Sequence, residues 1–190
     1  MLIYIHGFNS SALSFKAGLL RRRMAELRRS DELLTSELPP APSEAIEMLD
    51  ALVSAHAPRV ALIGSSLGGY YATWLAERHR VRAVLVNPAV RPYDLLAGYV
   101  GPQINLYTGA RYDFTAQHVD DLLKLEVQTI TPEHYLLMVE TGDEVLDYRH
   151  AVERYGGCQQ LVVEGGDHGF SDFGEYLDHA LQFCGSPANR

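Results

Sequence analysis

The stretch IGSSLGGYY at residues 63–71 joins an apolar run to a segment with helical character. The run RVALIG at 59–64 is typical of a buried β-strand, and residues 67–79 are predicted to form a helix. Between them, GSSLG fits the pattern G-x-S-x-G with Ser66 at its centre. Small flanking residues let the strand and the helix approach each other closely, which leaves the central serine at the tip of a sharp turn. The stretch therefore predicts a strand-turn-helix unit that presents a serine hydroxyl.

Short apolar runs and amphipathic segments alternate along most of the chain, outward from this turn in both directions. The expected strands are 2–5, 32–38, 59–64, 82–88, 134–140 and 159–166. The expected helices are 15–29, one capped by Ser43, 67–79, 148–155 and 171–184. Continuous apolar strands separated by helices are typical of a mainly parallel sheet with helices on both faces. We therefore expect one α/β domain over residues 1–190, with about six strands. The segment 92–132 carries no clear strand, and we interpret it as an insertion after the fourth strand.

Composition limits the classes of function that need to be considered. The chain has 190 residues and a formal net charge of -8, which argues against a nucleic-acid partner. The arginines of RRRMAELRR, at 21–29, are predicted to lie on a solvated helix face. No apolar run reaches the roughly 18 residues of a membrane span. The N-terminus lacks the features of a signal peptide, so we expect a soluble, cytoplasmic protein.

The metal-binding residue types show no spacing typical of a metal site. Cys158 and Cys184 lie far apart and form no C-x-x-C pair, so they suggest neither a zinc site nor a disulfide framework. The histidines are scattered without H-x-H or H-E-x-x-H spacing. We expect no metal and no cofactor.

A serine hydroxyl needs a base to become a nucleophile, and the base needs an acid to orient it. Asp143 follows the apolar run LLMVE, and His168 follows the run LVVE. Acid and histidine thus come after Ser66 in that order, each just beyond a predicted strand. Because the carboxyl ends of parallel strands meet at one edge of a sheet, we expect Ser66, Asp143 and His168 to form a catalytic triad.

Each member of this triad has a rival nearby in the sequence. Asp147 competes with Asp143, but Asp143 follows Gly142 directly and lies nearer the strand end. Asp167 is adjacent to His168, so its side chain is expected to point away from the imidazole. Ser65 competes with Ser66, but it is the variable residue of the motif. We favour Asp143, His168 and Ser66.

Developing negative charge on the substrate needs two hydrogen-bond donors. One is expected from the N–H of Leu67, directly after the serine. The other is expected from the loop after the first strand, HGFNSS at 6–11, where we choose Phe8 with Asn9 as a second option. His6 is interpreted as a structural histidine beside the site, because it precedes the serine at a strand end.

Five blocks of the chain together resemble the bacterial YqiA-like esterases (UPF0227), a subfamily of α/β-hydrolases. They are HGFNSS, GSSLGGYYATWLA, NPAVRPYDLL, TGDEVLDYR and EGGDHGF, and the resemblance covers residues 1 to about 184. It implies a serine esterase with the triad Ser66, Asp143 and His168, acting on small-molecule acyl esters. Acyl-CoA thioesterase activity and a non-catalytic, ligand-binding homologue are the alternatives. It also implies a minimal α/β-hydrolase fold, without the first two strands of the full fold.

The insertion at 92–132 would form a small lid over the serine in such a fold. Its apolar and aromatic residues are candidates to line an acyl pocket, and they also suit the plain role of packing the lid onto the body. We select Tyr93, Leu96 and Tyr107 among them, with Leu95, Tyr99 and Phe114 as further candidates. The sequence predicts neither the acyl chain length nor the oligomeric state.

Overall fold

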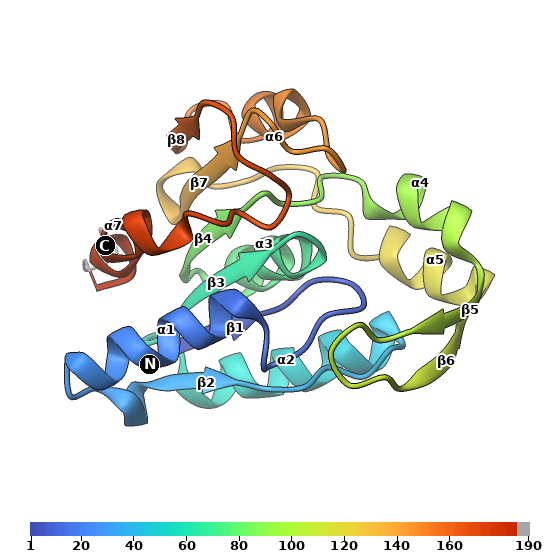
Figure 1. The fold of residues 1–190 in the computed structure, drawn as a ribbon, viewed down its shortest axis with the longest axis horizontal. Coiled ribbons are helices and arrows are strands. Elements are labelled where there is room, and N and C mark those ends of the chain that lie inside the picture. Colours follow the sequence, from blue (N-terminus) through green and yellow to red (C-terminus); the bar gives the residue numbers. More distant parts are fainter. Residues whose placement is uncertain (186–190) are drawn as a thin grey trace.

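A computed structural model describes residues 1–185 and shows a six-stranded sheet in which every neighbouring pair of strands is parallel (Figure 1). The strand order is β2-β1-β3-β4-β7-β8. These strands are β1 (Leu2–Ile5), β2 (Leu33–Thr35), β3 (Ala61–Ser65), β4 (Arg82–Val86), β7 (Tyr135–Glu140) and β8 (Gln159–Val163). The predicted α/β class and the parallel sheet are confirmed. The last five residues of the predicted domain, 186–190, lie outside the described residues.

Helices connect successive strands of this sheet. The α-helices are α1 (Phe15–Glu26), α2 (Pro42–His56), α3 (Leu67–His79), α4 (Pro92–Leu96), α5 (Ala116–Leu123), α6 (Tyr148–Arg154) and α7 (Phe173–Gly185). Short 3₁₀ helices lie at Ser30–Glu32, Ala97–Tyr99 and Pro132–His134. The expectation that Ser43 caps α2 was wrong. Ala41 is the N-cap and Pro42 the first helical residue, because proline's fixed φ and missing N–H suit that position.

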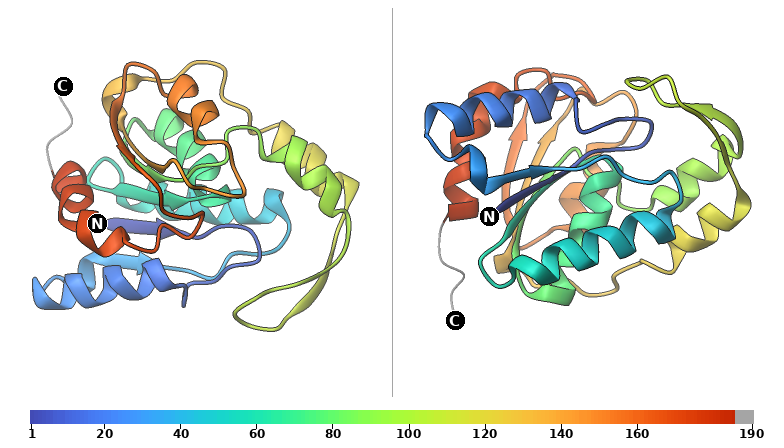
Figure 2. Two further views of the ribbon diagram at one scale, coloured as in Figure 1. Left: turned by 45° about the horizontal axis from the view of Figure 1, so that its top comes forward. Right: turned by 90° about the horizontal axis from the view of Figure 1, so that it is seen from below.

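The two faces of the sheet are covered by different helices (Figure 2). In β1, Ile3 and Ile5 pack with α2, α3 and α6, whereas Leu2 and Tyr4 pack with α1 and α7. This alternation follows from the period of two along a strand. Every residue of β1, β3 and β7 is buried, so each of these strands reads as a continuous apolar run rather than an alternating one. Burial of each large aliphatic side chain contributes roughly 1.5–3 kcal/mol to folding.

The insertion at 92–132 contains more regular structure than its sequence predicts. It holds α4 and α5 and, between them, an antiparallel hairpin of β5 (Gly101–Ile104) and β6 (Arg111–Phe114). The expectation of no strand here was therefore wrong. The hairpin has four residues per strand and half of its strand residues are exposed, so it carries no apolar run that would reveal it.

Candidate active site

The turn between β3 and α3 holds Ser66 in a strained backbone conformation. Ser66 is the N-cap of α3 and has φ 54° and ψ -121°. Such a conformation costs a non-glycine residue on the order of 1–3 kcal/mol and persists only where neighbours enforce it. Here the N–H of Ser66 donates to the carbonyl of Val86 at 3.0 Å, and its carbonyl accepts from Gly69 and Ala89 at 2.9 and 3.1 Å. The turn is thus tied to the end of β4.

The glycines of the motif are required by close backbone contacts. A Cβ atom on Gly64 would lie 2.3 Å from the carbonyl oxygen of Gly68. A Cβ atom on Gly68 would lie 2.1 Å from the carbonyl oxygen of Ile5. Both distances are far below van der Waals contact, so no side chain fits at either position. The pattern G-x-S-x-G therefore lets α3 start directly against β3 and β1.

Ser66, His168 and Asp143 form a continuous chain of hydrogen bonds. The Nδ1–H of His168 donates to Asp143 Oδ2 at 2.8 Å, which leaves Nε2 as an acceptor 3.1 Å from Ser66 Oγ. The side chain of Asp143 is 2% exposed, and its Oδ1 accepts from the N–H groups of Val145 and Leu146. Burial raises the pKa of Asp143, but the hydrogen bonds from His168 and these N–H groups outweigh it and hold the pKa below its usual range.

The rival residues are engaged elsewhere. Asp147 is the N-cap of α6 and accepts from the N–H of Arg149 at 3.0 Å. The side chain of Asp167 accepts from the hydroxyl of Ser171 at 2.6 Å. Ser65 is 5% exposed and lies within β3. The structure therefore brings Asp143, and not Asp147 or Asp167, to the imidazole.

Asn87, directly after β4, ties the loop of His168 to the sheet. Its Nδ2 donates to the carbonyls of Asp167 and His168 at 3.0 and 3.2 Å, and its Oδ1 accepts from the N–H of Glu140 at 3.0 Å. Asn87 is 2% exposed and adopts φ 40°. Sequence reasoning missed this residue. The one available signal was a polar side chain between an apolar strand and a proline.

Two buried charged groups lie against the same loop. Lys16 on α1 is 8% exposed, and its Nζ donates to the carbonyl of Gly169. Burial lowers the pKa of Lys16 to about 8, although the nearby carboxylates raise it. Glu140 is 1% exposed, and its Oε2 accepts from the N–H of Asp167 at 2.9 Å. Burial raises the pKa of Glu140 to about 7. Neither residue was singled out from the sequence.

The loop after β1 lies directly against the serine. A Cβ atom on Gly7 would lie 3.1 Å from Ser66 Cβ and 3.5 Å from its Oγ. Among the described residues, the N–H groups of Phe8 and Leu67 donate no hydrogen bond. N–H groups without a partner beside a serine hydroxyl are suited to bind a negatively charged oxygen. The helix N-terminus at Leu67 adds a partial positive charge.

His6 is held within the protein beside this loop. It is 5% exposed, and its Nδ1–H donates to the carbonyl of Gly7 at 3.0 Å. Its Nε2 lies 3.9 Å from Glu37 Oε2. Burial lowers the pKa of His6 below its usual value, which favours the neutral ring.

A cavity of about 590 Å³ opens between the segment after β4 and the loop after β7. Its apolar lining comes from Pro88, Ala89, Val90, Pro92, Leu95, Val145 and Leu146. The two segments that bound it also touch the serine and the acid. Ala89 N–H donates to the carbonyl of Ser66 at 3.1 Å, and Leu146 N–H donates to Asp143 Oδ1 at 2.8 Å. Two lining residues of the cavity thus hydrogen-bond Ser66 and Asp143, while neither of these two residues, nor His168, lines the cavity itself.

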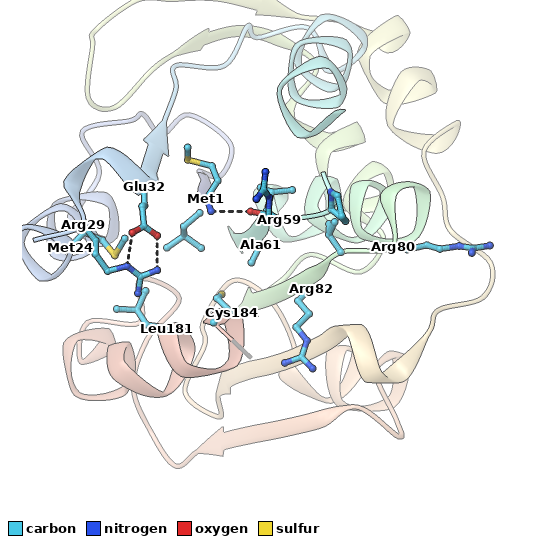
Figure 3. A pocket seen from close by; sticks show the side chains of 15 residues that line it. Met1, Met24, Arg29, Glu32, Arg59, Ala61, Arg80, Arg82, Leu181 and Cys184 are labelled. Carbon is cyan, nitrogen blue, oxygen red and sulfur yellow. Dashed lines mark hydrogen bonds and ion pairs between the residues drawn. The ribbon is translucent and has the colours of Figure 1, made fainter. Parts of the chain in front are cut away.

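Another cavity, of about 340 Å³, lies at the opposite edge of the sheet, where β1, β3 and β4 begin (Figure 3). It lies where these strands begin, whereas Ser66, Asp143 and His168 follow the ends of β3, β7 and β8. Arg29 at its rim is paired with Glu32 at 2.7 Å, and Arg80 points away from it. We assign it no part in the site.

The residues selected for an acyl pocket occupy three different environments. Tyr93 is 6% exposed and donates its hydroxyl to Glu126 Oε1 at 2.6 Å. Leu96 is 5% exposed and packs in the main hydrophobic core. Tyr107 is 51% exposed in the turn of the β5–β6 hairpin. Of the wider group of candidates, Leu95 lines the 590 Å³ cavity.

No helix within residues 1–185 combines the length and the apolar character needed to cross a bilayer.

Solved structures with a similar fold include proteins described as hydrolases. A hydrolase from Agrobacterium vitis S4 matches with a TM-score of 0.73 and 19% identity, covering 95% of this chain and 86% of that one. A monoacylglycerol lipase from Paleococcus ferrophilus matches with 0.66 and 15%, covering 96% and 94%. Est1E from Butyrivibrio proteoclasticus, solved with ferulic acid bound, matches with 0.65 and 15%, covering 95% and 86%. At these identities the likeness shows the α/β-hydrolase fold.

The family comparison covers more than the fold. The model of the family described as "Uncharacterised protein family (UPF0227)" matches residues 1–185, from the strand before the HGF loop to the end of α7. The match spans every element that carries Ser66, Asp143 and His168. The chain therefore belongs to the UPF0227 family, with an α/β-hydrolase fold.

Proposed function

We propose that this protein is a serine carboxylesterase that hydrolyses small-molecule carboxylic esters through an acyl-enzyme. The observation that carries the proposal is the hydrogen-bonded chain from Ser66 through His168 to the buried Asp143. A nucleophile, a base and an orienting acid in this geometry are the set that acyl transfer needs. The monoacylglycerol lipase among the solved structures with this fold supports the same class of chemistry.

The first half-reaction acylates Ser66. His168 Nε2 takes the hydroxyl proton as Oγ attacks the ester carbonyl carbon, so that an Oγ–C bond forms and the carbonyl oxygen becomes negative. Asp143 accepts the Nδ1–H bond and stabilises the imidazolium. The intermediate then collapses, the bond to the alcohol oxygen breaks, and His168 returns the proton to the leaving alcohol.

The second half-reaction repeats these steps with water. His168 removes a proton from water as the water oxygen attacks the acyl carbon. The proton then passes from His168 to Ser66 Oγ as the bond between Oγ and the acyl carbon breaks. The products are the carboxylic acid and the free enzyme. In both halves the N–H groups of Phe8 and Leu67 bind the oxyanion, and their lack of any other partner supports this role.

The 590 Å³ cavity is proposed to bind an apolar arm of the ester. Its volume lies within the range of small-molecule sites, and its lining combines seven apolar residues with Arg91, Asp94, Asp147, His150, Glu153 and Arg154. The insertion supplies Pro92 and Leu95 to its wall, and the loop after Asp143 supplies Val145 and Leu146. The insertion therefore contributes to the substrate site as a wall, consistent with a small lid.

The proposal is tested with p-nitrophenyl esters from acetate to palmitate, using the wild type and Ser66→Ala. We expect the wild type to hydrolyse at least one ester and Ser66→Ala to lose at least about 10³-fold in kcat. A fluorophosphonate should label Ser66 in the wild type and leave Ser66→Ala unlabelled. Retention of full activity by Ser66→Ala would exclude this mechanism.

Substrate class is tested in the same experiment. Acyl-CoA thioesters of matched chain length are assayed beside the esters, because the same triad serves both leaving groups. A higher kcat/KM for the thioesters would assign the protein as an acyl-CoA thioesterase. No labelling of wild-type Ser66 and no hydrolysis of either class would indicate a non-catalytic homologue.

A further inference from the structure

The β5–β6 hairpin is hydrogen-bonded to the loop that follows β1. The N–H of Leu106 donates to the carbonyl of Asn9 at 3.0 Å. The side chain of Asn105 donates to the carbonyl of Ser10 at 2.7 Å. These partners are about one hundred residues apart in the sequence. The hairpin thus donates hydrogen bonds to the carbonyls of the two residues that directly follow Phe8. The N–H of Phe8 is assigned above to the oxyanion site.

Asn9 directs its whole polar side chain to the hairpin. Its Nδ2 donates to Gln103 Oε1 at 3.0 Å, and its Oδ1 accepts from the hydroxyl of Tyr112 at 2.7 Å. Asn9 also adopts a left-handed backbone with φ 52°. Burial raises the pKa of Tyr112 to about 12, so its hydroxyl remains a donor at neutral pH. Two side chains of the insertion therefore hold an unfavourable backbone conformation in place.

The ring of Phe8 is fixed by the same insertion. It makes edge-to-face contacts with Tyr99, Tyr112 and Phe114, at centroid distances of 5.9, 6.5 and 5.2 Å. Phe114 is itself 1% exposed and belongs to the main core. Aromatic contacts of this kind orient a ring as well as bury it. The side chain of Phe8 is thus anchored on one side, while its N–H has no partner among the described residues.

We propose that the β5–β6 hairpin is a brace for the oxyanion loop, with Asn9 and Tyr112 as positioning residues. The proposal rests on the function proposed above, since it concerns the donor assigned to Phe8. Oxyanion donors act through preorganisation, and a donor that moves out of place loses its effect on the transition state. Loosening the brace should therefore lower kcat while the binding of the ground-state ester is kept.

The test compares Tyr112→Phe with Asp113→Asn. Tyr112→Phe removes the hydroxyl that holds Asn9 and keeps the aromatic ring against Phe8. Asp113 is the next residue of β6 and is exposed, and its side chain makes no hydrogen bond among the described residues, so it is the matched control. Asn9→Gly is the second variant, because glycine tolerates the left-handed φ and removes both side-chain bonds.

Three quantities are measured: kcat and KM for the best ester, the inhibition constant of a trifluoromethyl ketone that mimics the tetrahedral intermediate, and amide hydrogen exchange of residues 7–10. For Tyr112→Phe and Asn9→Gly we expect kcat and inhibitor affinity to fall together by about tenfold, with KM nearly unchanged. Exchange in residues 7–10 should quicken, and Asp113→Asn should match the wild type. A rise in KM at constant kcat would overturn the positioning role.

Failure of the brace and failure of the proposed function give different results. If the wild type hydrolyses no ester, the proposed function fails, while faster exchange of residues 7–10 in Tyr112→Phe still supports a brace on this loop. If exchange of residues 7–10 is unchanged in both variants, the brace is overturned whatever the activity of the wild type.

Discussion

Two regions support the candidate site, and they are built differently. The loop of His168 is tied to the sheet by Asn87 and Glu140, which are 2% and 1% exposed. The loop of Phe8 is tied to a hairpin whose Leu106 and Ile104 are 81% and 50% exposed. The difference implies that the base and its acid share the stability of the core. The oxyanion loop depends on a peripheral element that has to pack correctly before the site is complete.

The largest effect is expected from the acid in the core-supported region. Asp143→Asn should reduce kcat by about 10³–10⁴-fold, because an amide no longer fixes the imidazole tautomer or stabilises its positive charge. Steady-state hydrolysis of a short ester measures this change.

Asp147→Asn is the matched control for this substitution. Asparagine is also a good N-cap, so α6 should remain intact and kcat should change by at most about twofold. The comparison uses kcat rather than KM, because Asp147 also lines the 590 Å³ cavity. A larger loss in Asp147→Asn than in Asp143→Asn would reverse the assignment of the acid.

The sequence was sufficient to place Ser66, Asp143 and His168 at one edge of the sheet. Ser66 and Asp143 follow strands whose residues are all buried, His168 follows β8, and parallel strands end at a common edge. The family resemblance and the fold class are likewise confirmed.

The supports of the site were not predictable in the same way. Asn87 contacts His168 across 81 residues, and Lys16 contacts Gly169 across 153. No local pattern marks such pairs, since each residue is ordinary in its own segment. The β5–β6 hairpin was not predicted from the sequence for a different reason. Its strands include Pro102 and Arg111, and they are held by contacts with the β1 loop rather than by apolar alternation.

An intermediate effect is expected from the buried carboxyl of the core-supported region. Glu140 faces Asp167 and Asp172, with Lys16 nearby, and burial raises its pKa from 4.5 to about 7. A raised carboxyl pKa means that the folded state favours the protonated form. This contribution is complete below pH 4.5 and is lost as the pH rises through about 7. Glu140 should therefore remove up to about 3 kcal/mol of stability over this range.

Glu140→Gln tests this expectation, because the amide cannot ionise and its oxygen can still accept from the N–H of Asp167. Urea unfolding at several pH values between 4.5 and 8 gives the free energy of unfolding of both proteins. As the pH rises, the free energy of unfolding of Glu140→Gln should increase relative to that of the wild type. A constant difference across the range would show that Glu140 does not titrate there.

The smallest effect is expected where the insertion meets the substrate cavity. Leu95 lines the cavity from α4 and is 40% exposed, so Leu95→Trp should fill part of the space without disturbing the core. We expect kcat/KM for long acyl chains to fall by about tenfold relative to acetate. A second ladder, with the acyl group held at acetate and the alcohol lengthened, shows which arm of the ester occupies the cavity.

Leu27→Trp serves as the control for this change, since Leu27 lies just after α1, is 39% exposed and does not line the cavity. It should leave both ladders unchanged. If Leu95→Trp also leaves both unchanged, the cavity does not bind the substrate, and the insertion serves the site through the oxyanion loop alone. Suppose that the chain-length preference changes for the acyl series and not for the alcohol series. The insertion then lines the acyl site and also positions the Phe8 N–H that binds the oxygen of the ester carbonyl. The peripheral region would then control chain-length selection as well as rate, while the core-supported region controls proton transfer.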